Sequence, residues 1–317
     1  MQKNQKLKFF SRIAVSVTIA IILLIHLDVR QFSSHFYAVS WPLLGAIILL
    51  LVPSVLLRAC RWKLLFEDDT HRIGLGGSMT LLLVGMALNL VLPASTGDIA
   101  KSYFGYKWSG VKERMLSVSI LDKVIALASV AVLGIPCAIY RNEPLYAYLS
   151  TLVLLPALIL LVLPILIERV PFCRKLFGTA TKVMKNKLDF LKVARQVNPG
   201  KNKLAAAVAL SVAGWLVTYF QMYLCFRAVN ARIPVFYVFS VAPLLTLVRL
   251  FPFTFSGIGS DEAALYYFFT RAGPALEGII AGALVYRFFT IIVPGLIGVF
   301  FLAGTKRMAY NENSEQA

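Results

Sequence analysis

The sequence predicts an all-α integral membrane protein that crosses the bilayer several times. Of its 317 residues, 59% are hydrophobic and only 15% are charged. Several segments stay apolar for about the ~20 residues that a helix needs to cross roughly 30 Å of hydrocarbon. The sequence lacks the alternating segments of about 10 residues that are typical of a transmembrane β-barrel. The backbone must therefore satisfy its hydrogen bonds within helices.

Six full spans and two interrupted segments are expected. The spans fall near residues 9–27, 41–58, 115–139, 146–167, 204–228 and 276–303. Two further apolar stretches, beginning near Met79 and Pro234, meet proline, small residues and then acidic residues. If each is a re-entrant hairpin, few basic residues face the far side of the membrane: Arg30, Arg141, Arg227, Arg232 and Arg271. Because Lys and Arg concentrate in cytoplasmic loops, we expect two re-entrant broken-helix hairpins, with both termini in the cytoplasm. The protein is expected to be a multi-pass protein of the cell (plasma or inner) membrane.

We expect one transmembrane domain, residues 1–303, followed by a cytoplasmic tail, 304–317. The two interrupted segments can be aligned, and each precedes an apolar helix with a central basic residue, Lys123 or Arg287. With the expected topology this predicts an inverted repeat, with halves of about 1–167 and 204–303. The segment 168–203 between them has apolar residues at helical spacing with lysines between them. That pattern is typical of a helix on the anionic cytoplasmic leaflet, contacting it through 169–203; a solvated basic linker is the alternative.

The formal net charge of +17 is best explained by basic residues held beside anionic lipid, and no nucleic acid is expected as a partner. The four cysteines form no CxxC pair and the three histidines have no ligand spacing, so neither a metal nor a cofactor is expected.

Charged residues around the two breaks are the main functional signal. They are Asp98, Lys101, Asp122, Lys123, Arg249, Asp261, Glu262 and Arg287. One charge at the centre of a membrane helix costs roughly 2.5–3.5 kcal/mol, so these groups must pair or line a wet cavity. Asp122 and Lys123 are adjacent and project about 100° apart on a helix, so each needs a partner from another segment. Internal salt bridges that merely orient helices are the alternative interpretation.

The breaks themselves are candidate anion sites. Pro93 and Pro252 stop or kink a helix. Small and hydroxyl residues follow them: Ser95, Thr96 and Gly97 in the first break, and Ser256, Gly257 and Gly259 in the second. Each break can present a helix N-terminus with free N–H groups at membrane depth, where phosphate binds readily; a plain hairpin turn is the alternative. Arg58, Arg61 and Lys63, with Trp62, are interpreted as an interfacial anchor after the second span.

Four segments in order resemble a known family: NLVLPASTGDIAKSY, SILDKVIALAS, FPFTFSGIGSDEAAL and ALVYRFFTIIVPGLIG. Over roughly residues 10–303 the chain resembles the flippase-like membrane domain family, which includes the membrane half of lysylphosphatidylglycerol synthetases and related stand-alone proteins. Glu262 and Arg287 match the family pattern. The family usually has Gly-Glu followed by Arg, and Asp-Arg, where this chain has Gly97-Asp98 with Lys101, and Asp122-Lys123. Because lysine lacks the planar fork of arginine, a different headgroup is expected.

The resemblance implies a lipid translocase that binds a phosphate-bearing headgroup of a phospholipid or a polyprenyl-linked lipid in a charged intramembrane cavity. The soluble transferase domain of the synthetases is absent from the sequence, so we expect no enzyme activity. Two alternatives stay open: a membrane-embedded lipid-modifying enzyme (a phosphatase or a glycosyltransferase), or an accessory scaffold for a lipid or glycan synthase. The expected partners are membrane lipids, and the chain could also associate with a second copy of itself or with a partner synthase.

Overall fold

The computed structural model describes residues 27–67, 73–92, 96–140, 200–248 and 260–302, with isolated positions at 18, 25, 142, 144, 147–148, 150–155 and 157–158. Every regular element in these ranges is a helix. The expected all-α membrane class is thereby confirmed. Of the segment 168–203, residues 168–199 lie outside the described residues, as do the tail 304–317 and most of the expected spans 9–27 and 146–167.

Four helices are long and apolar enough to cross a membrane. They are α3 (Trp41–Phe66), α6 (Lys112–Tyr140), α10 (Lys201–Ala228) and α13 (Leu276–Arg287), which continues through a π-helical turn, η4 (Phe288–Ile292), to Leu302. They correspond to four of the six expected spans. The total number of spans stays a prediction.

Two pairs of shorter helices occupy the positions of the expected hairpins. α4 (Leu75–Asn89) packs against α5 (Gly97–Ser109), and α11 (Val235–Val248) packs against α12 (Ser260–Phe269). The 15 residues of α4 rise about 22 Å, which is less than the roughly 30 Å of a bilayer core. Both pairs therefore have the dimensions of broken-helix hairpins, although 93–95 and 249–259 lie outside the described residues.

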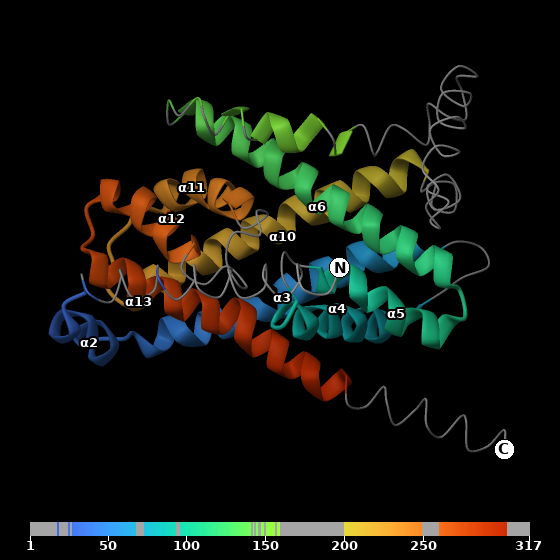
Figure 1. The fold of residues 1–317 in the computed structure, drawn as a ribbon, viewed down its shortest axis with the longest axis horizontal. Helices are drawn as coiled ribbons and strands as arrows, with labels where there is room; N and C mark the ends of the chain where they lie inside the picture. Colours follow the sequence, from blue (N-terminus) through green and yellow to red (C-terminus); the bar gives the residue numbers. More distant parts are fainter. Residues whose placement is uncertain are drawn as a thin grey trace.

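α10 is the central element of the arrangement. It runs along the length of the molecule, with α3 packed along it (Figure 1). α6 and α11 cross it on one side, and α13 also packs against it. The first hairpin lies toward one end of the molecule (right in Figure 1), whereas α2 (Val29–Tyr37), α11 and α12 lie toward the other.

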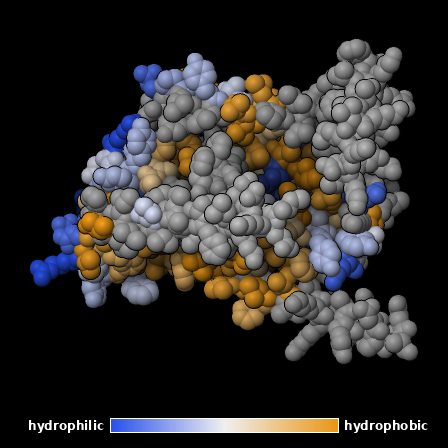
Figure 2. All heavy atoms as spheres, in the orientation of Figure 1, coloured by the Kyte–Doolittle hydropathy of each residue, from blue (hydrophilic) through white to orange (hydrophobic). Residues whose placement is uncertain are grey.

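The apolar residues divide between an inner core and an outer, lipid-compatible surface. Tyr219 and Phe226 of α10 are buried against α11, α12 and α13. In contrast, Leu49 and Val52 of α3 are 73% and 62% exposed, and Phe300 is 78% exposed. Hydrophobic side chains cover much of the visible surface in Figure 2. Large exposed apolar side chains on helices of this length suit contact with acyl chains.

The helix that continues from α13 packs tightly on α4. A side chain at Gly298 would collide with the backbone carbonyl of Leu83, and one at Gly295 would lie 2.7 Å from Leu90 Cδ1. At Gly298 the two backbones approach closely because glycine carries no Cβ atom, as is common between membrane helices.

The expected end of the second span and its interfacial anchor were wrong. α3 continues past residue 58 to Phe66, and Arg61 and Trp62 are only 6% and 1% exposed. The Trp62 and Phe66 rings stack at 5.3 Å within a core that includes Met115 of α6. A basic residue can be buried here because a carboxylate of α6 faces it.

Candidate functional site

The start of α5 is fixed by contacts across the first break. The Gly97 N–H donates to Asn89 Oδ1 at 2.8 Å, and Asn89 Nδ2 donates to Asp98 Oδ1 at 3.0 Å. A Cβ at Gly97 would lie 2.6 Å from the Asn89 nitrogen and from the Gly85 carbonyl oxygen, so only glycine fits there. Asn89 thereby joins the end of α4 to the first turn of α5 and orients Asp98.

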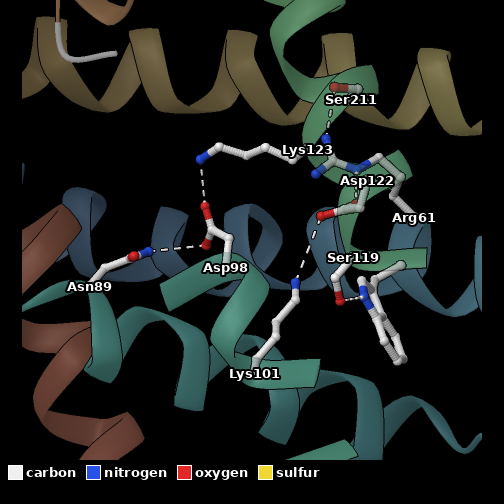
Figure 3. A network of polar contacts seen from close by, with 9 residues as sticks. Arg61, Asn89, Asp98, Lys101, Ser119, Asp122, Lys123 and Ser211 are labelled. Carbon is white, nitrogen blue, oxygen red and sulfur yellow. Dashed lines mark hydrogen bonds and ion pairs between the residues drawn. The ribbon is translucent and has the colours of Figure 1, made fainter. Parts of the chain in front are cut away.

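Asp98 and Lys123 form an ion pair between the first hairpin and α6. Lys123 Nζ lies 2.7 Å from Asp98 Oδ2 (Figure 3). The two side chains are 23% and 26% exposed, so both are partly buried. This pair joins the residue after the break to the basic residue at the middle of the following helix.

Asp122 forms ion pairs with two buried cations, Arg61 and Lys101. Arg61 Nε lies 2.7 Å from Asp122 Oδ1, and Lys101 Nζ lies 3.7 Å from Asp122 Oδ2. Asp122 and its neighbour Lys123 thus have partners on different segments, as their adjacent positions predicted. α3, α5 and α6 all contribute a charged side chain to this network, which Figure 3 shows with the Asp98 pair beside it.

The two buried cations have further polar contacts. Arg61 Nη1 donates to Ser211 Oγ of α10 at 2.8 Å. Lys101 is 1% exposed, and its ammonium lies 5.7 Å from the centre of the Trp62 ring. The Trp62 indole N–H in turn donates to Ser119 Oγ at 3.4 Å. These contacts satisfy groups that would otherwise cost several kcal/mol to bury.

Arg58 lies on α3, one turn from Arg61. Its Nη2 donates to Thr218 Oγ1 at 3.1 Å, and its guanidinium lies 5.7 Å from the centre of the Trp215 ring, both on α10. Asp98 and Asp122 are close enough to act on its charge electrostatically. Arg58 therefore adds a positive group to the same region.

Sequence reasoning missed Arg58, Arg61 and Asn89 as members of this site. One signal was present: Arg58 and Arg61 are three residues apart, and the apolar residues continue beyond them to Phe66. Residues three apart lie on one face of a helix, so a helix that did not end at 58 would have directed both guanidinium groups to one neighbour.

A second charged cluster follows the second break. Arg287 of α13 lies 3.3 Å from Asp261 Oδ2 and 3.0 Å from Glu262 Oε1 of α12. The spacing is nearly that of the first cluster: Asp261 and Arg287 are 26 positions apart, and Asp98 and Lys123 are 25 apart. This near-equal spacing fits the expected repeat, which stays a prediction. The π-helical turn η4 begins directly after Arg287, and such turns occur often at functional sites.

The predicted site residues thus fall into three groups. Asp98, Lys101, Asp122 and Lys123 come together, with Thr96 and Gly97 at the start of the same helix. Asp261, Glu262 and Arg287 form a separate set. Five others lie outside the described residues: Ser95, Arg249, Ser256, Gly257 and Gly259. Whether the two breaks face one another stays a prediction.

The first cluster offers chemistry suited to an anion. Its ammonium and guanidinium groups are donors without acceptor capacity. Between apolar helices such groups attract a phosphate more strongly than in water, because the surroundings screen charge poorly. Among the described residues no group of three His, Cys, Asp or Glu is placed to hold a metal ion.

Comparison with known proteins identifies relatives over most of the chain. Residues 11–298 match the family described as the lysylphosphatidylglycerol synthase TM region. A UPF0104 membrane protein of Methanothermobacter thermautotrophicus is 23% identical over 266 residues, 75% of this chain and 78% of that protein. A UPF0104 membrane protein of Methanocaldococcus jannaschii is 26% identical over 67% of this chain and 92% of its own length. The phosphatidylglycerol lysyltransferase of Bacillus subtilis is 26% identical over 104 residues, 33% of this chain and 12% of that enzyme.

Proposed function

Because the chain belongs to the family of lysylphosphatidylglycerol synthase TM regions, we propose that it binds a phosphate-bearing lipid headgroup between its helices and moves it across the bilayer. The family match covers residues 11–298, nearly the same part of the chain as the resemblance seen in the sequence. The phosphatidylglycerol lysyltransferase shares similarity with part of this region, which supports a role that concerns lipid.

The observation that carries the proposal is a polar network set among long apolar helices, with one partly exposed ion pair beside its buried charges. Asp122, Arg61 and Lys101 are fully buried, whereas Asp98 and Lys123 beside them are about a quarter exposed. If the charges served only to align the helices with one another, a single well-packed ion pair would be enough. A buried network that ends in an accessible ion pair is what a transient polar ligand needs, since the inner charges hold the outer pair in place.

Geometry suggests how a headgroup would be held. Lys123 Nζ has Asp98 as its carboxylate partner among the described residues, so an arriving phosphate competes with that carboxylate for it. Exchange of one charged partner for another keeps the ammonium paired throughout, which avoids the cost of an unpaired charge in the membrane. The acyl chains stay in the lipid beside the exposed apolar faces of the helices.

A proteoliposome assay tests the proposal. Purified protein is reconstituted with a fluorescent phospholipid, and the fraction accessible to a membrane-impermeant quencher is followed over time. Lys123→Gln is expected to slow translocation at least about tenfold, the effect of ~1.4 kcal/mol in a barrier. Lys107→Gln is the matched control, because Lys107 is exposed and lies over the Tyr103 ring away from the network. Equal rates for Lys123→Gln and the unmodified protein, at equal reconstitution, would remove Lys123 from the site.

We also propose that the chain moves lipid without modifying it. Incubation with radiolabelled phospholipid, followed by chromatography, is expected to return the label unchanged. Formation of a new labelled product by the purified protein would establish the alternative, a lipid-modifying enzyme.

A further inference from the structure

The charges of the first cluster do not balance. It contains four cations, Arg58, Arg61, Lys101 and Lys123, and two carboxylates, Asp98 and Asp122. Two positive charges are in excess. Within the described part of the chain, no other carboxylate lies within ion-pair distance of these four cations. Excess charge between membrane helices is costly, so an occupant that brings negative charge would be stabilised.

Both carboxylates are already occupied by the protein's own donors. The two Asp122 oxygens face Arg61 and Lys101, and the two Asp98 oxygens face Lys123 and the amide of Asn89. All four carboxylate oxygens therefore have a partner. An ammonium group on a ligand would have to displace one of these partners, and it would add to the excess of positive charge.

Among the described residues, Arg58 has more unused donors than Arg61, the other arginine of the cluster. Its guanidinium carries five N–H donors, of which one group, Nη2, donates to Thr218. Its guanidinium carbon also lies 5.7 Å from the centre of the Trp215 ring of α10, within cation–π distance. A planar fork held in this way can bind two phosphate oxygens at once, which a lysine cannot do.

Part of the cluster reaches the surface of the described residues. Figure 2 shows hydrophilic atoms in a hollow bordered in part by hydrophobic side chains, near the crossing of α6 and α10 in Figure 1. Lys123 and Asp98 are the members of the network with the greatest exposure among its ion pairs.

From these observations we infer that the site takes a lipid headgroup of net negative charge, a phosphate ester without a compensating amine, and discriminates against zwitterionic and aminoacylated headgroups. The inference rests on the proposed function, because it concerns the ligand of the same site. It separates this chain from any member of the family that handles a lysyl-lipid, whose headgroup carries net positive charge.

Lipid retention measures this selectivity directly. The protein is placed in nanodiscs of phosphatidylcholine that contain equal minor amounts of phosphatidylglycerol and lysyl-phosphatidylglycerol, and the lipids that remain bound are identified by native mass spectrometry. We expect phosphatidylglycerol to be retained over its lysyl derivative by at least about tenfold. Arg58→Gln is expected to abolish the preference, whereas Lys107→Gln, which removes an exposed charge, should keep it. Arg58→Lys, which keeps the charge without the fork, replaces Arg58→Gln if that variant does not elute as a single folded species.

The outcomes separate the two proposals. Retention of lysyl-phosphatidylglycerol equal to that of phosphatidylglycerol overturns the charge selectivity and leaves lipid binding in place. Retention of none of these lipids above phosphatidylcholine overturns the proposed function itself. A further arm adds soluble glycerol phosphate, and complete displacement of the retained lipid by this anion would assign the site to free phosphate esters and overturn the lipid assignment.

Discussion

Removal of the Asp122 carboxylate would leave two buried cations without their counter-ion. At an effective dielectric constant of roughly 20, the attraction of Asp122 to Arg61 at 2.7 Å is about 6 kcal/mol, and that to Lys101 at 3.7 Å is about 4.5 kcal/mol. The cost of desolvating all three groups opposes most of this gross attraction. Breaking a buried pair by removing one partner nevertheless costs about 3–5 kcal/mol, because the remaining charges stay buried. We expect Asp122→Asn to lose this much folding free energy.

Asp98→Asn is the matched comparison. Its ion pair with Lys123 has the same length, 2.7 Å, but both side chains are about a quarter exposed, so water screens the attraction. We expect a loss of about 1 kcal/mol or less. The assay is denaturant unfolding of the purified variants in one detergent, followed by tryptophan fluorescence and checked by size-exclusion chromatography. If Asp122→Asn is no less stable than Asp98→Asn, burial of the network does not set its energetics and the reasoning fails.

Three further predictions concern other parts of the fold. Gly97→Ala is expected to lower the melting temperature strongly, because the new methyl group would lie 2.6 Å from backbone atoms of α4. Gly45→Ala should leave the melting temperature unchanged, because nothing lies within 4 Å of the new methyl group; similar melting temperatures for the two variants would contradict the close approach at Gly97. Lys107→Cys should react with an impermeant maleimide from the cytoplasmic side, and labelling from the outside would overturn the expected topology. Arg287→Ala should slow lipid translocation while the exposed Arg271→Ala does not, as measured in proteoliposomes; equal rates would exclude the second cluster from transport.

The helical membrane class followed from the sequence because apolar runs of about 20 residues have few other structural solutions. The sequence also indicated that Asp98, Lys123, Glu262 and Arg287 need partners, although it did not assign the pairs that the structure shows. In each case a charge that cannot reach water needs a partner, and few partners were near in the sequence.

Arg61 could not be placed in this way. A basic residue near the end of an apolar run ordinarily lies at the membrane interface, and nothing local distinguishes this one. Its partner, Asp122, is 61 residues away, so its burial depends on how α3 packs against α6. Asn89 was missed for a related reason: an amide at the end of a helix is ordinary until the chain turns back and places Gly97 and Asp98 against it.

The glycines that lie against α4 restrict which residues the helix after α13 can carry. A Cβ at Gly298 would collide with the Leu83 carbonyl, and one at Gly295 would lie 2.7 Å from Leu90 Cδ1. A larger side chain at either position would push this helix away from the first hairpin, which carries Asp98. The contact between the last described helix and that hairpin therefore depends on the absence of side-chain atoms at these two glycines.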